Sequence, residues 1–153
     1  MAAKVVVQDV TDAGFRPAQF GTPADWEAGA GYLARVIARA EVWARGEFGA
    51  GYDTVATGTP TYEHLRSAEL CWVRAELWKR RAAFIDSNAV SALDNLAHAD
   101  RREFEAQAER AMQCAQDAMA AAAGAGPRGS AIAFASVESG PFLRGVPGGA
   151  RCG

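Results

Sequence analysis

The segment from Pro60 to Phe84 limits the fold more than any other part of the sequence. Thr59 and Pro60 provide an N-cap residue and a first helical residue, which predicts a helix start at this point. At about 100° per residue, one face of this helix carries the apolar residues Leu70, Val73, Leu77 and Phe84. A second and roughly opposite face carries Cys71, Ala75, Trp78 and Ala82. A helix that is apolar on two faces needs cover on both.

Two arrangements satisfy this requirement. In the first, a three-helix domain wraps its central helix within one chain. In the second, another subunit covers one of the two faces. Large aromatic side chains anchor both cores and interfaces, and this helix carries two tryptophans six residues apart. We therefore assign one set of residues to the core or to a subunit interface: Leu70, Trp72, Val73, Leu77, Trp78 and Phe84.

A helix is predicted before this central segment, from about residue 23 to 45. Thr22 and Pro23 repeat the start signal, and Gly46 and Gly49 mark the end. Spacings of three and four residues predict a buried stripe of Trp26, Ala30, Leu33, Ile37, Ala40 and Ala44. Residues 46 to 58 are then expected to form a loop.

A third helix is predicted after the central segment. Ser91 followed by Asp94 resembles a capping box, and Gly124 is a natural C-terminal stop. A helix of about 30 residues spans about 45 Å, so we expect it either to break near Asp100 or to project from the domain. One side carries a stripe of mostly small residues suited to close packing: Phe104, Ala108, Ala111, Ala115, Ala118, Met119 and Ala122.

The two ends of the chain differ from the helical part. Residues 5 to 10, VVVQDV, are rich in valine, which predicts a short strand or a capped turn. Residues 125 to 153 are rich in glycine and proline, with alternating apolar residues in SAIAFASV. The fold class is therefore mainly α: a small bundle of three or more helices over residues 1–124, with a strand-like N-terminal segment and an extended C-terminal tail over residues 125–153.

The composition excludes several classes of protein. The 153 residues carry 16 basic and 18 acidic side chains, so no global field attracts the chain to nucleic acid or to a membrane surface. No apolar run reaches the length of a membrane span. Three widely spaced cysteines, Cys71, Cys114 and Cys152, suit a reducing cytoplasm and argue against a disulfide framework or a zinc site.

No catalytic pattern is present, and we predict neither an enzyme nor a metal or cofactor site. His64 and His98 lie in no recognisable metal-binding spacing. Cys71 and Cys114 are expected to be small buried hydrophobic residues. The basic runs Lys79-Arg80-Arg81 and Arg101-Arg102 are interleaved with acids, so a solvated or salt-bridged surface is the favoured interpretation over a DNA-binding site.

The order of these segments resembles a known family. A strand-like start, the helix DWEAGAGYLARVIARAEVWA, a loop, and then YEHLRSAELCWVRAELWKRRAAFIDSNA with a long polar helix after it are similar to the head-tail connector or adaptor proteins of tailed bacteriophages. The likeness covers roughly residues 5 to 123 in element order and length. It rests on the overall pattern of the sequence and on no sharp motif.

The resemblance implies a structural virion protein at the head-tail junction, assembled in the host cytoplasm. Such a protein forms a ring of twelve subunits beneath the portal, extends the DNA channel without sequence-specific contacts, and receives a stopper or tail-completion protein below. The C-terminal segment then docks on the portal protein through Ile132, Phe134, Val137, Phe142 and Leu143. The alternative from a different class is a cytoplasmic helical regulator or binding module that acts as a dimer and binds DNA through its basic pairs.

Overall fold

The computed structural model describes residues 3–20, 26, 31–88 and 94–124, with the backbone alone for 84–88 and 94–100. Four α-helices make up this part of the chain: α1 (Val7–Asp12), α2 (Tyr32–Phe48), α3 (Pro60–Asn88) and α4 (Asp94–Ala122). Two short 3₁₀ turns, η1 (Pro17–Phe20) and η2 (Tyr52–Thr54), complete it, and these described ranges contain no strand. The predicted class, a small and mainly α-helical bundle, is confirmed.

The N-terminal valine-rich segment is a short capped helix, so the strand, one of the two predicted alternatives, was wrong. The Asp9 carboxylate accepts the Val6 N–H at 2.9 Å, while the Asp9 N–H donates to the Val6 carbonyl at 3.1 Å. This reciprocal pairing closes the first turn of α1. Val5 and Val10 are buried at 2% and 0% exposure. Local capping, together with tertiary burial, overrides the strand preference of the valines.

Helix α2 starts later than predicted and ends close to the predicted position. The predicted start signal, Thr22 and Pro23, lies outside the described residues. Of the expected stripe, Leu33, Ala40 and Ala44 are buried on α2. Trp26 is also buried, but it precedes the helix, and its carbonyl accepts the Leu33 N–H at 3.1 Å. The helix ends at Gly49, which has a positive φ of 83° that favours glycine.

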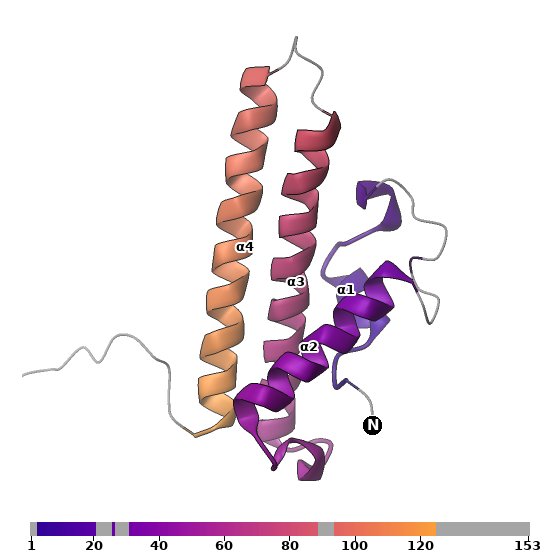
Figure 1. Cartoon of the computed structure of the whole chain (residues 1–153). Coiled ribbons are helices and arrows are strands. Elements are labelled where there is room, and N and C mark those ends of the chain that lie inside the picture. The colour runs from indigo at the N-terminus through magenta and orange to yellow at the C-terminus, as the bar shows by residue number, and fades with distance from the viewer. Residues whose placement is uncertain (1–2, 21–25, 27–30, 89–93, 125–153) are drawn as a thin grey trace, which may run out of the picture.

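Helices α3 and α4 form a long antiparallel hairpin (Figure 1). The Thr59 hydroxyl accepts the Tyr62 N–H at 3.2 Å, so the predicted N-cap of α3 is confirmed. Helix α4 is unbroken at Asp100, and its upper part runs with α3 beyond the level that α2 reaches. The predicted small-residue stripe is buried at Ala108, Ala111, Ala115, Met119 and Ala122. Small side chains let the two backbones approach closely over the length of the hairpin.

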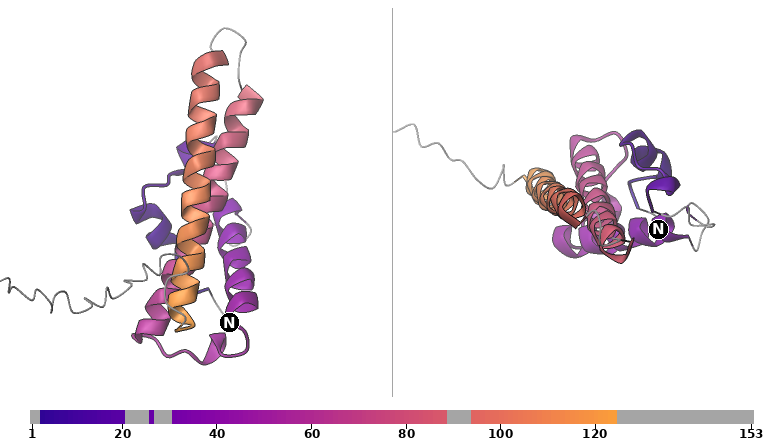
Figure 2. Two further views of the ribbon diagram at one scale, coloured as in Figure 1. Left: turned by 90° about the vertical axis from the view of Figure 1, so that its left-hand side faces the viewer. Right: turned by 90° about the horizontal axis from the view of Figure 1, so that it is seen from above.

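The core lies on two sides of α3, and Figure 2 shows α3 between α4 and the N-terminal segment when the molecule is seen from above. A larger cluster joins the N-terminal segment and α2 to α3: Val5, Val10, Phe15, Phe20, Trp26, Leu33, Val36, Ala40, Val73 and Leu77. A smaller cluster joins α2, η2, α3 and α4 near the end of α4: Ala44, Tyr52, Leu65, Ala68, Met119 and Ala122. The central helix is therefore covered within its own chain.

A disulfide links Cys71 on α3 to Cys114 on α4, with 5.8 Å between the two Cα atoms. The sequence argued against a disulfide, and that prediction was wrong; the expected burial holds for Cys71, which is 4% exposed. Cys71 belongs to the face of α3 that α4 covers, and Cys114 directly precedes the buried Ala115. Spacing along the sequence does not reveal this pairing, because the antiparallel register of two long helices creates it. Cys152 lies outside the described residues.

Candidate functional site

The residues predicted for the core or a subunit interface pack inside this chain wherever their side chains are described. Val73 and Leu77 are fully buried, and Leu70, Trp72 and Trp78 are partly buried against the larger cluster. Trp78 makes an edge contact with Phe15 at 5.1 Å between ring centroids. The side chain of Phe84 lies outside the described part. The first of the two predicted arrangements therefore accounts for both apolar faces of α3.

The surface where α2 crosses α3 carries four cross-helix contacts, and we call the residues that make them the α2–α3 strip. The Arg80 guanidinium lies 5.2 Å from the centre of the Tyr32 ring. Arg39 binds Glu76 with 3.2 Å between nitrogen and oxygen. The rings of Trp43 and Trp72 stack with centroids 6.3 Å apart, and Arg39 also lies 5.8 Å from the Trp72 ring. The strip consists of Tyr32, Arg39 and Trp43 from α2 with Trp72, Glu76 and Arg80 from α3.

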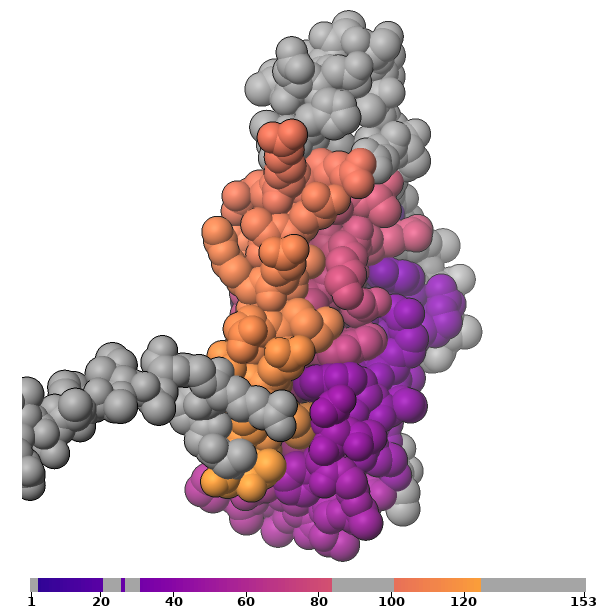
Figure 3. All heavy atoms as spheres, turned by 60° about the vertical axis from the view of Figure 1, so that its left-hand side comes forward, coloured from indigo at the N-terminus to yellow at the C-terminus, as the bar shows by residue number. Residues whose placement is uncertain are grey.

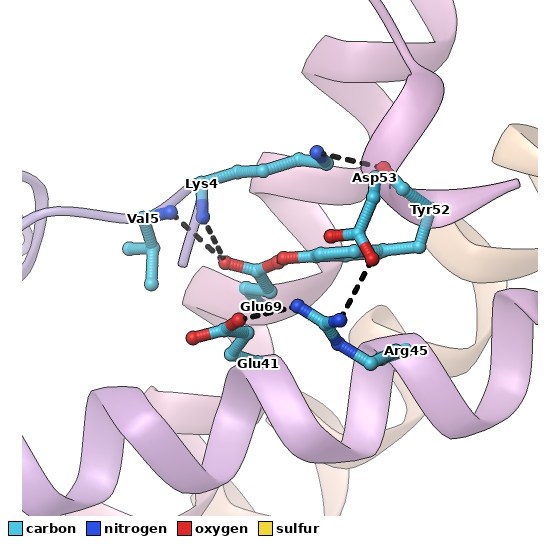
Figure 4. Close-up of polar contacts among 7 residues, drawn as sticks. All are labelled: Lys4, Val5, Glu41, Arg45, Tyr52, Asp53 and Glu69. Atoms are coloured by element: carbon cyan, nitrogen blue, oxygen red, sulfur yellow. Dashed lines mark hydrogen bonds and ion pairs between the residues drawn. The ribbon is translucent and has the colours of Figure 1, made fainter. Parts of the chain in front are cut away.

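A buried carboxylate joins three segments of the chain (Figure 4). Glu69 on α3 is 0% exposed and is the only fully buried charged residue among the described side chains. One of its oxygens accepts the backbone N–H groups of Lys4 at 2.7 Å and of Val5 at 3.0 Å. The other oxygen accepts the Tyr52 hydroxyl. Glu69 thus fastens both the N-terminal segment and the η2 turn to the central helix.

Burial determines the protonation behaviour of this pair. Desolvation raises the pKa of Glu69 above its ordinary value of 4.5, against the opposing hydrogen bonds from Tyr52, Val5 and Lys4. The pKa of Tyr52 is also raised, first by burial and then by its hydrogen bond to the Glu69 carboxylate. The Tyr52 phenol therefore stays protonated and remains the donor in this bond throughout the neutral range.

At about 100° per residue, the sequence predicts a polar seam of Glu69, Glu76 and Arg80 along one flank of α3. For Glu69 this prediction is wrong, because its side chain is fully buried. Glutamate is rarely buried unless it is paired, so a solvated position was the reasonable expectation. The signal that pointed the other way is spacing: Leu65, Glu69 and Val73 recur every four residues and share one face of α3. All three are 0% exposed. The partners of Glu69 lie 17 and 64 or more residues away in sequence, so no local pattern reveals them.

Charged side chains around this buried centre reinforce it. Lys4 Nζ donates to the Tyr52 carbonyl at 3.2 Å and lies 4.1 Å from the centre of the Tyr52 ring. Arg45 bridges Glu41 and Asp53, with both ion pairs at 2.7 Å (Figure 4). Because Glu41 and Arg45 belong to α2, this bridge ties α2 to the η2 turn. The whole cluster is structural in character, since its polar groups satisfy one another.

A second anchor holds α1 on α3. The Arg66 guanidinium donates to both oxygens of Asp9, at 3.1 and 2.5 Å. Burial raises the pKa of Asp9, but the hydrogen bonds from Arg66 and from the Val6 N–H, together with the charge of Arg66, bring the net pKa below 3.8. Glu63 lies 3.7 Å from the same guanidinium. The two-oxygen geometry fixes the orientation of α1 as well as its position.

The upper end of the α2–α3 strip borders an open pocket of about 540 Å³. Its lining consists of Tyr32, Arg35, Val36, Ala38 and Arg39 from α2 with Arg80 from α3. Three of these six residues carry a guanidinium group. Burial raises the pKa of Tyr32, while the charges of Arg80, Arg39 and Arg35 oppose that rise. The sequence analysis favoured a solvated or salt-bridged surface for the basic runs, and it did not bring Arg80 together with α2.

The structure describes only some of the other residues that the sequence analysis singled out. His64 is exposed on the first part of α3. In the basic runs, Lys79 pairs with Glu76 at 3.0 Å and Arg101 with Glu105 at 2.8 Å, as the salt-bridged interpretation predicts. No group of three or more His, Cys, Asp or Glu side chains in the described ranges is placed to hold a metal ion. The predicted tail residues lie outside those ranges: Ile132, Phe134, Val137, Phe142 and Leu143.

Among the helices that the structure describes, none is long and apolar enough to cross a membrane. A comparison of the chain with protein-family models, with curated proteins and with solved structures found no match.

Proposed function

We propose that this chain is a head-tail adaptor of a tailed bacteriophage, a virion protein that forms a ring of twelve copies between the portal and the stopper or tail-completion protein. The ring extends the channel through which DNA passes without sequence-specific binding. The resemblance of the sequence to head-tail adaptor proteins supports this family. The helical fold agrees with an adaptor, whereas stopper and tail-completion components, the nearest rivals in the virion, are richer in strands. The chain's place is then the head-tail junction, after assembly in the host cytoplasm.

The observation that carries the proposal is the presence of two unlike open surfaces on different helices. Helix α4 packs on α3 and touches α2, and its other side is open to solvent over most of the helix (Figure 3). That open side is polar and carries Arg102, Glu103, Glu105, Glu109, Arg110, Gln113 and Gln116. A closed ring is built from heterologous contacts, in which one surface of a subunit meets a different surface of the next.

The second surface belongs to α2. Among the side chains that the structure describes, Val42, at 70%, and Val6, at 50%, are the two exposed large hydrophobic ones. Val42 follows Arg39 by three residues on α2, so the two side chains share one face of the helix, and Arg39 belongs to the α2–α3 strip. An exposed valine on this face is suited to close contact with a neighbour. We assign this surface to one side of the subunit contact and the open side of α4 to the other.

The C-terminal segment completes the proposal. Residues 125–153 follow Gly124 directly at the end of α4, and the smaller core cluster anchors that end through Met119 and Ala122. The segment therefore starts from a fixed point on the bundle. Its alternating apolar residues are of the kind that adds a strand to a partner's sheet edge, where backbone hydrogen bonds supply affinity and side chains supply specificity. The portal protein is the partner that we assign to it.

Two arms test the proposal: assembly of the intact chain, and attachment of a chain truncated after Gly124 to the portal ring. We expect the truncated chain to keep its helical circular dichroism and melting temperature and to lose co-sedimentation with the portal. A truncated chain that still attaches would refute the docking role of the tail. A stable free dimer that never assembles with vertex proteins would refute the adaptor and favour the DNA-binding regulator.

A further inference from the structure

Helix α4 is attached by larger side chains toward its two ends and by small side chains between them. Near the end of α4, Met119 belongs to the smaller core cluster. Toward the start of α4, the Phe104 ring stacks on Trp78 with centroids 5.4 Å apart, and the Arg81 guanidinium lies 4.5 Å from the centre of the Phe104 ring. Between these two attachments the buried residues of α4 are three alanines, which belong to neither core cluster: Ala108, Ala111 and Ala115.

The disulfide between Cys71 and Cys114 lies in this alanine-rich stretch, next to Ala115. An alanine buries a single methyl group, so each contributes little hydrophobic free energy. The crosslink closes a loop of 43 residues, and a long closed loop removes much conformational entropy from the unfolded chain. The middle of the α3–α4 contact therefore depends on the disulfide more than its two ends do.

The two cysteines differ in their exposure to solvent. Cys71 is 4% exposed, whereas Cys114 is partly exposed and directly follows the exposed Gln113. Thiol–disulfide exchange starts when a thiolate attacks one of the two sulfurs, so access to one of them is sufficient. A small thiol can therefore approach from the side of Cys114 while the bundle stays folded, and Cys71 is then the leaving sulfur.

A cation lies one helical turn from that leaving sulfur. Arg74 follows Cys71 by three residues on α3, so the two share a face of the helix. The Arg74 Nε atom is buried and has no hydrogen-bond partner in the described part of the chain. Negative charge develops on the leaving sulfur, and a nearby positive charge stabilises it. Around Cys114, Arg110 and Asp117 lie about one turn before and after it, and their opposite charges oppose each other.

The proposed function places this disulfide in two different chemical surroundings, and this step of the argument rests on that proposal. An adaptor is assembled in the host cytoplasm, where disulfides are rare and those that form are usually transient or redox-sensing. The completed particle leaves the cell for an oxidising medium, in which disulfides persist. The same two cysteines therefore meet a reducing and then an oxidising environment.

We propose that Cys71 and Cys114 form a redox lock on α4, which is open as two thiols in a reducing cytoplasm and closed as a disulfide in an oxidising medium. A small disulfide such as oxidised glutathione is the oxidant. The thiolate of one cysteine displaces one glutathione, and the second cysteine displaces the other from the mixed disulfide. The two cysteine protons end on two molecules of reduced glutathione. The closed lock fixes the middle of α4, whose open side is one of the two proposed subunit surfaces.

The test is hydrogen exchange, measured by mass spectrometry, of the full-length chain in glutathione buffers that range from oxidising to reducing. All samples carry Cys152→Ser, which removes the one cysteine outside the pair. We expect the amides of residues 105–116 to exchange at least about tenfold faster once the pair is reduced, because the middle of α4 then opens locally. The matched control also carries Cys71→Ala and Cys114→Ala, and its exchange is equally fast in every buffer.

Two further readouts separate local opening from unfolding. Residues 5–12 are the internal reference, since the Arg66–Asp9 ion pair and the Glu69 carboxylate hold this segment on α3. We expect their exchange to change by less than about twofold on reduction. The reduced chain also keeps its helical circular dichroism, because the two core clusters remain in place.

The inference is overturned by a pair that stays oxidised in the most reducing buffer, by equal exchange of the oxidised and reduced chains, or by loss of helicity on reduction. In the last case the disulfide is a staple that folding requires. None of these measurements needs the ring. A chain whose lock responds but which never assembles with the portal keeps the lock and refutes the adaptor, and a ring-forming chain whose exchange ignores the redox state does the reverse.

Discussion

Replacement of Glu69 by alanine is the sharpest test of how this bundle is held together. The change leaves the Val5 N–H and the Tyr52 hydroxyl without their acceptor, and both residues are almost fully buried. Each orphaned buried donor costs about 2 kcal/mol, and removal of a desolvated carboxylate offsets part of the sum. We expect the free energy of unfolding to fall by about 3 kcal/mol.

Urea denaturation followed by circular dichroism measures this loss. Glu69→Gln is the informative companion, because an amide oxygen can still accept the two backbone N–H groups and the amide nitrogen can donate to the Tyr52 oxygen. We expect it to cost about 1 kcal/mol, the charge-assisted part of the bonds. Glu47→Ala on the exposed side of α2 controls for the loss of a glutamate. An alanine variant at position 69 as stable as the control would refute the reasoning.

The same position makes a prediction about pH. Because the pKa of Glu69 in the folded protein is raised above 4.5, the folded state keeps a proton that the unfolded state loses as pH rises. The contribution of Glu69 to stability is therefore largest below pH 4.5 and declines as pH rises through its folded pKa. Glu69→Gln removes this decline, so the difference in unfolding free energy between wild type and variant must shrink toward higher pH. A difference that grows with pH contradicts the account.

Three further changes test other parts of the fold. Asp9→Asn weakens the partly exposed ion pair with Arg66 and lowers the free energy of unfolding by about 1 kcal/mol at neutral pH. This difference disappears as pH falls through the lowered pKa of Asp9, because the wild type loses the ion pair there too. Acid titration of the stability of both proteins measures it. Cys114→Ser removes the disulfide to Cys71, which closes a loop of 43 residues, and lowers the free energy of unfolding by about 4 kcal/mol relative to the oxidised wild type. Urea denaturation measures this loss, and a wild type whose stability a reductant does not change contradicts the link. Leu77→Ala, at a fully buried position, costs about 3 kcal/mol, and an unchanged melting temperature rules out its place in the core.

The helices were predicted well where capping residues and apolar spacing within the helix itself mark them. The Thr59-Pro60 pair marked the start of α3, and the alanine stripe of α4 followed directly from spacings of three and four residues. The predicted start of α2 is less accurate, because Thr22 and Pro23 predict a helix start well before Tyr32, where α2 begins. Periodicity predicts which residues share a face, and it is weaker at helix boundaries.

The features that sequence reasoning missed all need two or more segments to meet. Glu69 is buried because Tyr52 and the N-terminal backbone supply its donors. Cys71 and Cys114 pair because α3 and α4 run antiparallel in one particular register. The pocket between α2 and α3 exists because α2 brings Arg35 and Arg39 close to Arg80 of α3. The residues in each of these features lie far apart in the sequence, so no short motif predicts that they meet. Each feature forms only when the helices pack together.

The subunit stoichiometry of the assembled protein tests the central claim most directly. Native mass spectrometry measures it, on the intact chain alone and on the chain mixed with the portal protein. The variant is Val42→Glu, and the control is Val6→Glu, at the second exposed valine among the described side chains. The account predicts a ring of twelve copies for the wild type and for the control, and monomers for the Val42 variant. A stable dimer that does not assemble on the portal, or a Val42 variant that forms the ring as well as the wild type does, would contradict it.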